Sequence, residues 1–220
     1  MTESAVSVAE SGSREGRLNR VRRVIIVAPH FPPSNLASVH RSRLLAHHLN
    51  EFGWEPIIVT VAPEFYEEDL DWELTKLVNS TLRVERVGAL PTRPVRIVGD
   101  IGIRGFVPML RRIVRLIDEE GADFLYITIP SFFAAPLGRL VHALRGTPYG
   151  IDYIDPWVHK SPASERRLTK AWLSLKLAEW LEPFSVHKAS LITGVTERSY
   201  SPVFDRNPHL NKVAVRATMP

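Results

Sequence analysis

The stretch VIIVAPHFPPSNLASVHRSRLLAHHLNEFGW, residues 24–54, decides the fold class of this chain. Its first residues form a β-branched run typical of a buried strand, and the prolines that follow stiffen the loop leaving that strand. From Ser38 to Phe52 the apolar residues recur at helical spacing. A strand followed directly by a helix indicates an alternating α/β fold.

The alternation continues along the chain. Short β-branched runs predict strands at Val24–Ala28, Ile57–Ala62, Leu82–Val87, Phe124–Ile129, Tyr149–Ile154, Leu191–Val195 and Val213–Val215. Helical spacing predicts helices at Ser38–Phe52, Gly105–Glu120, Phe132–Leu144, Arg166–His187 and Thr196–Asp205, with a looser stretch over Glu64–Val78. We therefore expect a disordered basic tail over residues 1–22, then one Rossmann-like domain over residues 23–220 with a doubly wound, mostly parallel sheet.

Composition narrows the class of protein. The chain has 220 residues, 45% of them hydrophobic, and a formal net charge of +4. It has no cysteine, which removes disulfides and thiolate metal sites and fits a reducing cytosol. Because the sequence has no HExxH motif or comparable cluster, we expect no bound metal. The N-terminus shows no pattern of a secretory signal peptide. We expect a cytoplasmic protein without a nucleic-acid partner, and contact of the basic tail with anionic lipid stays open.

In a doubly wound sheet, ligands bind at the carboxyl ends of the strands. In the first such loop, Ser34, Asn35 and Ser38 offer caps for the helix that follows, and Arg41 lies one turn further on. A helix start with a nearby arginine suits an anion such as a diphosphate, although an ordinary helix cap explains the same residues. The absence of GxGxxG and GxxxxGK[ST] argues against dehydrogenases and P-loop NTPases.

Two later segments carry further candidates. Asp155 follows a buried strand on a turn stiffened by proline, where its carboxylate could orient or deprotonate an acceptor hydroxyl, or simply cap the turn. The segment from residue 91 to 104 places Arg93, Arg96 and Arg104 among apolar residues and glycines. That pattern suits a phosphorylated lipid acceptor or an anionic membrane, and equally an ordinary surface loop.

The predicted helix at Arg166–His187 has two apolar faces. One is formed by Leu168, Ala171, Trp172, Leu175 and Ala178, and the other by Leu173, Leu177, Trp180, Leu181 and Phe184. One face can cover the sheet. The other requires a neighbouring helix, a membrane, another subunit or a further domain.

Three segments together resemble the family 4 glycosyltransferases of the GT-B fold. VIIVAPHFPPSN followed by LNEFGWEPIIVTV resembles the family's first strand, loop, helix and second strand. IDYIDPW resembles a D-x-R-D-P-W segment of one branch, and HKASLITGVTERSYSPV resembles the A-D-L-I-T-x-V-S-E strand and helix. The matches occur in family order over about residues 23–220.

This resemblance implies the N-terminal, acceptor-side half of a retaining, metal-independent enzyme that moves a sugar from a nucleotide-sugar donor to a glycan or lipid acceptor. It places Asp155 near the transferred sugar and assigns no cofactor. The first loop lacks the family's usual glycine, and the family's donor pocket lies mostly in a C-terminal domain that this chain does not include. We therefore expect little activity from the chain alone. The alternative is a non-catalytic binding or regulatory module, or a truncated relic, that pairs with a separate C-terminal domain.

Overall fold

The computed structural model describes residues 21–92, 99–129, 131–159 and 167–219. The predicted tail therefore lies outside the described residues up to residue 20, as do Arg93, Arg96 and Arg166, the first residue of the predicted helix at Arg166–His187.

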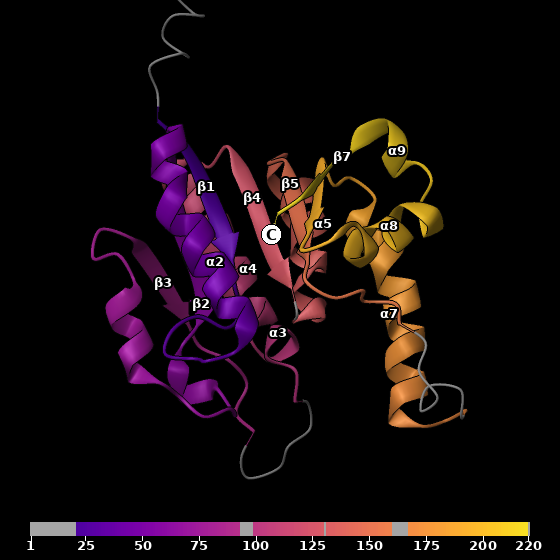
Figure 1. Cartoon of the computed structure of the whole chain (residues 1–220), viewed down its shortest axis with the longest axis horizontal. Coiled ribbons are helices and arrows are strands. Elements are labelled where there is room, and N and C mark those ends of the chain that lie inside the picture. Colours follow the sequence, from indigo (N-terminus) through magenta and orange to yellow (C-terminus); the bar gives the residue numbers. More distant parts are fainter. Residues whose placement is uncertain (1–20, 93–98, 130, 160–166, 220) are drawn as a thin grey trace, which may run out of the picture.

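The fold is one parallel sheet with helices on both faces, as the sequence predicts (Figure 1). The strands are β1 (Arg22–Val27), β2 (Trp54–Val61), β3 (Arg83–Val87), β4 (Phe124–Ile129), β5 (Tyr149–Tyr153), β6 (Leu191–Gly194) and β7 (Val215–Thr218). They are arranged in the order β3-β2-β1-β4-β5-β6-β7, and every neighbouring pair is parallel. The order reverses between β1 and β4, which makes the carboxyl ends of these two strands the switch point of the sheet.

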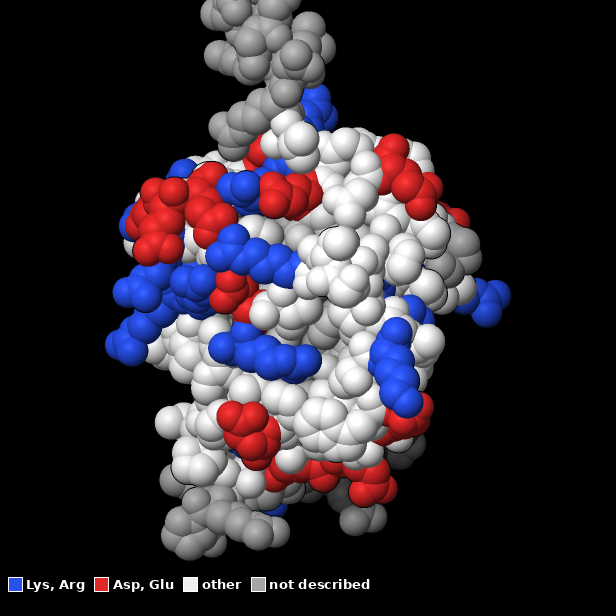
Figure 2. Space-filling model, turned by 90° about the vertical axis from the view of Figure 1, so that its left-hand side faces the viewer, with Lys and Arg blue, Asp and Glu red and all other residues white. Residues whose placement is uncertain are grey.

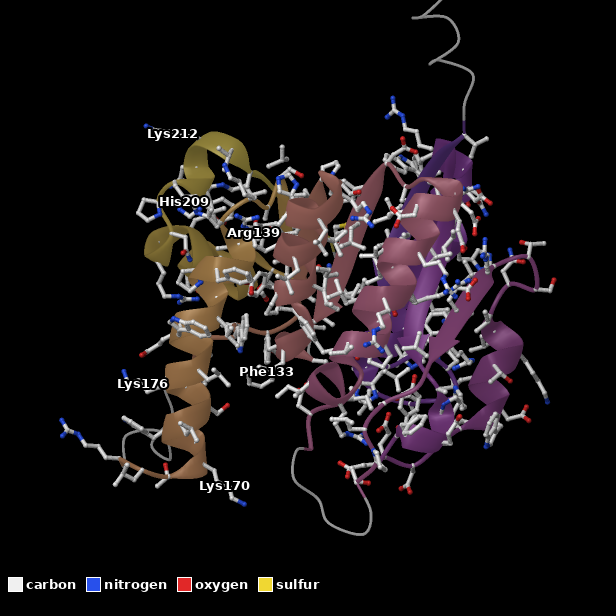
Figure 3. The ribbon with its side chains drawn as sticks, turned by 180° about the vertical axis from the view of Figure 1, so that it is seen from behind. Phe133, Arg139, Lys170, Lys176, His209 and Lys212 are labelled. Atoms are coloured by element: carbon white, nitrogen blue, oxygen red, sulfur yellow. The ribbon has the colours of Figure 1, made fainter. Side chains whose placement is uncertain are left out.

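The helices divide unequally between the two faces. The α-helices are α2 (Ala37–His48), α3 (Ile101–Arg104), α4 (Phe106–Glu120), α5 (Pro136–Arg145), α7 (Lys170–Val186), α8 (Glu197–Arg206) and α9 (Leu210–Val213). Short 3-10 turns occupy Leu49–Phe52, Pro63–Phe65, Trp72–Leu77 and Phe132–Ala134. Helix α2 lies on one face in contact with β2 and β4, the strands on either side of β1, whereas α4 and α5 cover the other face and α7 packs beside α5 (Figures 1 and 3).

The core follows this division. The larger cluster of buried side chains lies between the sheet and α4, α5 and α7, and a smaller cluster lies under α2. At Gly138 in α5 the helix approaches the sheet so closely that a Cβ would lie 2.3 Å from the Tyr149 ring of β5. A side chain at this position would force the helix away from the strand.

Several boundaries differ from the sequence prediction. The first helix ends at His48 and continues only as a 3-10 turn, and the looser stretch at Glu64–Val78 forms two 3-10 helices. The short helix α9 was not predicted, because four residues are too few to show a helical period.

The free edge of the sheet at β3 is covered by paired charges of both signs (Figure 2). Arg83 in β3 contacts Glu120 at 2.6 Å and Glu85 at 2.7 Å, and Arg112 contacts Glu85 at 3.0 Å. Such charges on an edge strand oppose pairing with another chain. They also leave no continuous basic surface on the side of the molecule seen in Figure 2.

Candidate functional site

A polar cluster forms where β1 ends, at the switch point of the sheet. The Nδ1 atom of His30 lies 2.7 Å from a carboxylate oxygen of Glu68, and the hydroxyl of Ser34 donates to the same oxygen at 2.5 Å. The segment that carries Glu68 is fixed against this loop by a bridge between Ser34 and Leu70 and by the Asp71 amide, which donates to the Pro33 carbonyl at 2.8 Å. Two segments distant in sequence thus form one unit.

The electrostatics of the cluster fix the proton on His30. Burial alone would raise the pKa of Glu68, but the hydrogen bonds from His30 and Ser34 outweigh it and lower that pKa to about 2. An ionised carboxylate can only accept hydrogen bonds, so Nδ1 of His30 carries a proton. In a neutral ring the other nitrogen, Nε2, is then left as an acceptor.

A cavity of about 460 Å³ opens beside this cluster. It is lined by His30, Leu36, Glu67, Glu68, Gly99, Asp100, Ile101, Arg104 and Ser131. Burial raises the pKa of Asp100, whose carboxylate accepts from the Ile103 amide at 3.1 Å and so caps α3. The cavity therefore combines carboxyl groups, a histidine, an arginine and a serine hydroxyl with apolar side chains such as those of Leu36 and Ile101.

Arg104 is buried at this cavity, with only 3% of its surface exposed. Its guanidinium donates to the carbonyls of Leu90 at 3.1 Å and Phe65 at 2.6 Å, and these bonds hold the neighbouring loops together. Its Nε atom is buried and has no partner within the described part of the chain. Among the described residues, this donor is thus left without an acceptor.

Arg41, expected on the diphosphate side, is engaged inside the domain instead. Its Nε and Nη2 atoms lie 2.5 and 2.9 Å from the two carboxylate oxygens of Asp152 in β5, and Nη1 donates to the Met219 carbonyl. Asp152 is fully buried and also accepts from the Thr193 hydroxyl at 2.7 Å. The bidentate hydrogen bond to Asp152 raises the pKa of Arg41. This guanidinium fastens α2 to the sheet.

The expected helix cap at the start of α2 is wrong. The N-cap residue is Leu36, which makes no side-chain hydrogen bond. Ser34 is buried against Glu68, Ser38 is buried inside the first turn, and Asn35 is exposed in the loop. The Ser34 hydroxyl, which the sequence suggested as a helix cap, donates instead to Glu68, 34 residues further along the chain.

Asp155 lies exposed in the loop after β5, at the same carboxyl edge. Trp157 anchors this turn. Its ring is buried, stacked on Phe132 with ring centroids 5.9 Å apart, and meets Phe133 edge-on at the same separation. The carboxylate of Asp155 thus projects from a loop held in place by aromatic packing.

The family model described as "Glycosyl transferase 4-like domain" matches residues 37–216. The chain belongs to this glycosyl transferase 4-like family. No curated protein sequence matches it.

Solved structures agree with this assignment at the level of fold. The chain is similar to HepE of Anabaena in complex with UDP and glucose (12% identity, TM-score 0.55, covering 90% of this chain and 44% of that one). It is also similar to sucrose-phosphate synthase of Thermosynechococcus elongatus (13% identity, TM-score 0.57, covering 90% of this chain and 48% of that one). A third similar structure is a ugt transferase of Siraitia grosvenorii in complex with UDP (12% identity, TM-score 0.52, covering 90% of this chain and 51% of that one). The chain spans about half the length of these proteins, so its fold is that of one half of a GT-B glycosyltransferase.

An apolar groove distinguishes the other end of this glycosyl transferase 4-like domain. It has a volume of about 450 Å³ and lies between α2, the sheet and the C-terminal strand. Its walls are Val24, Leu45, Leu49, Trp54, Phe124, Tyr126, Ser190, Leu191, Val215 and Met219. No group of three or more histidine, aspartate or glutamate residues that could hold a metal occurs among the described residues.

Sequence reasoning missed His30 and Glu68. His30 directly follows the first strand, a position that deserved attention in a parallel sheet. Nothing in the sequence marked Glu68 as a site residue, because it lies within the acidic run Glu67–Asp69, which is typical of a solvent-exposed surface.

Proposed function

We propose that this domain is the acceptor-side half of an enzyme that transfers a sugar from a nucleotide-sugar donor to a glycan or lipid acceptor. The observation that carries the proposal is the polar cavity at the switch point, in a chain that belongs to this family. The UDP named in two of the similar structures suggests a uridine nucleotide as the donor's leaving group.

The lining of the cavity fits neutral hydroxyl groups better than a diphosphate. The carboxyl oxygens of Glu68 and Asp100 accept hydrogen bonds, as does Nε2 of His30 in a neutral ring, whereas the Ser131 hydroxyl can donate them. A sugar hydroxyl both donates and accepts, so it can use both kinds of group. A diphosphate would instead meet the ionised Glu68 at close range, which is unfavourable. We therefore assign the cavity to the acceptor, and expect the donor to be held mainly by a second domain.

Asp155 remains our candidate catalytic carboxylate, with the role of orienting or deprotonating the acceptor hydroxyl. Its exposed position on an anchored loop at the carboxyl edge supports this role. In the complete or reconstituted enzyme, Asp155→Asn should lower kcat at least tenfold with little change in stability. Unchanged turnover would eliminate the role. Asp205→Asn, on an exposed residue of α8, is the matched control and should leave turnover unaltered.

The experiment that tests the function is sugar transfer measured with and without a second half. The chain alone should neither hydrolyse UDP-glucose nor bind UDP tightly, whereas mixing it with a C-terminal glycosyltransferase domain from the same genome should restore transfer. Turnover by the chain alone would contradict the assignment of the donor pocket to a second domain.

A second candidate function is a non-catalytic module that pairs with a separate C-terminal domain. The apolar groove beside α2 favours a docking role of this kind, because it is large, apolar and open. A stable complex without transfer activity would support the module and exclude the enzyme. We place either function in the cytoplasm, since a chain without cysteine fits a reducing compartment.

A further inference from the structure

Helix α7 exposes one of its two apolar faces. The α7 stripe consists of Leu173 (63% exposed), Leu177 (37%), Trp180 (72%) and Phe184 (42%). These residues are spaced by four, three and four positions, so at about 100° per residue they share one side of the helix. The opposite side carries the buried residues Ala178, Glu182 and Ser185. The neighbouring helix that we considered as a cover for this second face is therefore not found among the described residues.

Lysines flank the stripe on both sides. At about 100° per residue, Lys170 lies about 50° to one side of its centre and Lys176 about 70° to the other. Lys176 contacts Glu179 at 2.6 Å, one turn along the helix. The other acidic side chain of α7, Glu182, faces inward and contacts Arg206 at 2.7 Å. The exposed side of α7 is thus apolar at its centre, with Lys170 at one margin and Lys176, paired with Glu179, at the other.

Lys188 and Arg139 add positive charge near the C-terminal end of α7. Burial together with His209, Lys188 and Arg139 lowers the pKa of His187, whose ring lies 5.2 Å from that of His209, so His187 itself adds little charge at neutral pH. Figure 3 shows Arg139, His209 and Lys212 around this end of the helix, and Lys170 and Lys176 along its lower part. Within the described part of the chain, Lys170, Lys188 and Lys212 take part in no ion pair.

The charge pattern identifies the occupant of this face. We propose that the α7 stripe docks on the surface of an anionic lipid bilayer. An apolar stripe with lysines at its margins is how a helix lies in the plane of such a surface, with its apolar side chains among the acyl chains and its lysines at the phosphates. Tryptophan favours this interface because its ring is apolar and its N–H polar. A second copy of the chain would bring the same lysines against each other, which opposes self-association.

The helix is also placed and sized for docking rather than for insertion. The first turns of α7 extend past the carboxyl edge of the sheet, in the views of both Figure 1 and Figure 3. The described residues include no helix with the length and hydrophobicity to span a bilayer. The proposal does not depend on the transfer reaction and extends the protein's function to a membrane partner.

Vesicle sedimentation tests the proposal with the full chain. We expect the protein to sediment with vesicles of phosphatidylcholine and phosphatidylglycerol (7:3), and at least tenfold more weakly with phosphatidylcholine alone. The double variant Trp180→Ser/Phe184→Ser should reduce binding to the anionic vesicles at least tenfold. Trp72→Ser, on a tryptophan that is 62% exposed in a different part of the fold, is the matched control and should bind like the parent.

A second pair of variants tests the charge. Lys170→Glu/Lys176→Glu should weaken binding to the anionic vesicles at least tenfold, whereas Lys76→Glu, on an exposed lysine of a 3-10 helix, should not. Circular dichroism checks that every variant is folded. Absence of sedimentation would overturn the proposal. So would binding that Trp180→Ser/Phe184→Ser leaves unchanged, because the arginines near the N-terminus would then explain it. A dimer in light scattering that this variant abolishes, without vesicle binding, would assign the stripe to a second copy and overturn the proposal equally.

Discussion

Breaking the ion pair between Arg41 and Asp152 from one side should strongly destabilise this domain. Asp152→Ala removes the carboxylate that receives two guanidinium bonds, at 2.5 and 2.9 Å, and the Thr193 hydroxyl. The Arg41 side chain is only 13% exposed, so it cannot turn fully to water. Breaking a buried ion pair from one side leaves an uncompensated charge and costs about 3–5 kcal/mol. That is a large fraction of the roughly 5–15 kcal/mol by which a domain is stable.

Removing both charges together should cost much less. In Arg41→Met/Asp152→Leu no charge is left buried, and the main losses are the hydrogen bonds of the Thr193 hydroxyl and of the Met219 carbonyl, worth about 1 kcal/mol each. The free energy of unfolding of both variants, from urea denaturation at pH 7 followed by circular dichroism, gives the coupling between the two residues. Asp118→Ala breaks a pair of the same bidentate geometry with Arg145, at 2.5 and 2.7 Å, but on the surface. This control variant should leave the urea concentration at the midpoint of unfolding almost unchanged.

The outcome decides the role of Arg41. If Asp152→Ala and Asp118→Ala were equally mild, the buried pair would not hold α2 to the sheet. If Arg41→Met left stability intact but abolished UDP binding by the complete enzyme, the diphosphate role expected from the sequence would hold and the structural reasoning would be refuted.

Two further predictions concern the site and the core. Because the folded pKa of Glu68, about 2, lies below its ordinary value of 4.5, the group adds stability above about pH 4.5 and loses it as the pH falls towards 2. Unfolding measured from pH 6 to pH 3 should therefore show a smaller acid-induced loss in Glu68→Gln than in the parent, and equal losses would refute this. Gly138→Ala, whose Cβ would lie 2.3 Å from the Tyr149 ring, should lower the free energy of unfolding by about 1–3 kcal/mol. Gly88→Ala, where the nearest atom is 3.8 Å away, should not, and equal effects of the two would contradict the packing argument.

The sheet was predictable because its signals are local. The run at residues 24–28 and those that follow it are β-branched and bounded by turns, and the strand–helix alternation dictates parallel pairing. The two apolar faces of α7 were also visible in the sequence. Which of the two faces is covered depends on how α7 packs against α5, and this packing cannot be predicted from the local sequence pattern.

The site was less predictable because its contacts are long-range. The hydroxyl of Ser34 has a local use as a helix cap, but the carboxylate of Glu68 lies within hydrogen-bonding distance only after the chain folds. Arg41 likewise suits an anion at a helix start until Asp152, 111 residues away, is placed beside it. In both cases a carboxylate brought near by folding replaces the local partner, because charge-assisted hydrogen bonds are the stronger ones.

The two proposed surfaces differ in chemistry, and both relate to the same edge of the sheet. The lining of the cavity at the switch point includes carboxyl groups that suit hydroxyl groups, whereas α7 extends past that edge with lysines beside its stripe. An acceptor that combines a phosphate-bearing lipid with a sugar would meet both demands, with its phosphate at the bilayer beside α7 and its hydroxyls in the cavity. Docking through α7 should then lower KM for a lipid-linked acceptor and leave KM for a soluble sugar unchanged. In the complete enzyme, Trp180→Ser/Phe184→Ser should accordingly raise the first KM without altering the second. An equal rise in KM for both acceptors would contradict this link between membrane docking and the binding of the lipid-linked acceptor.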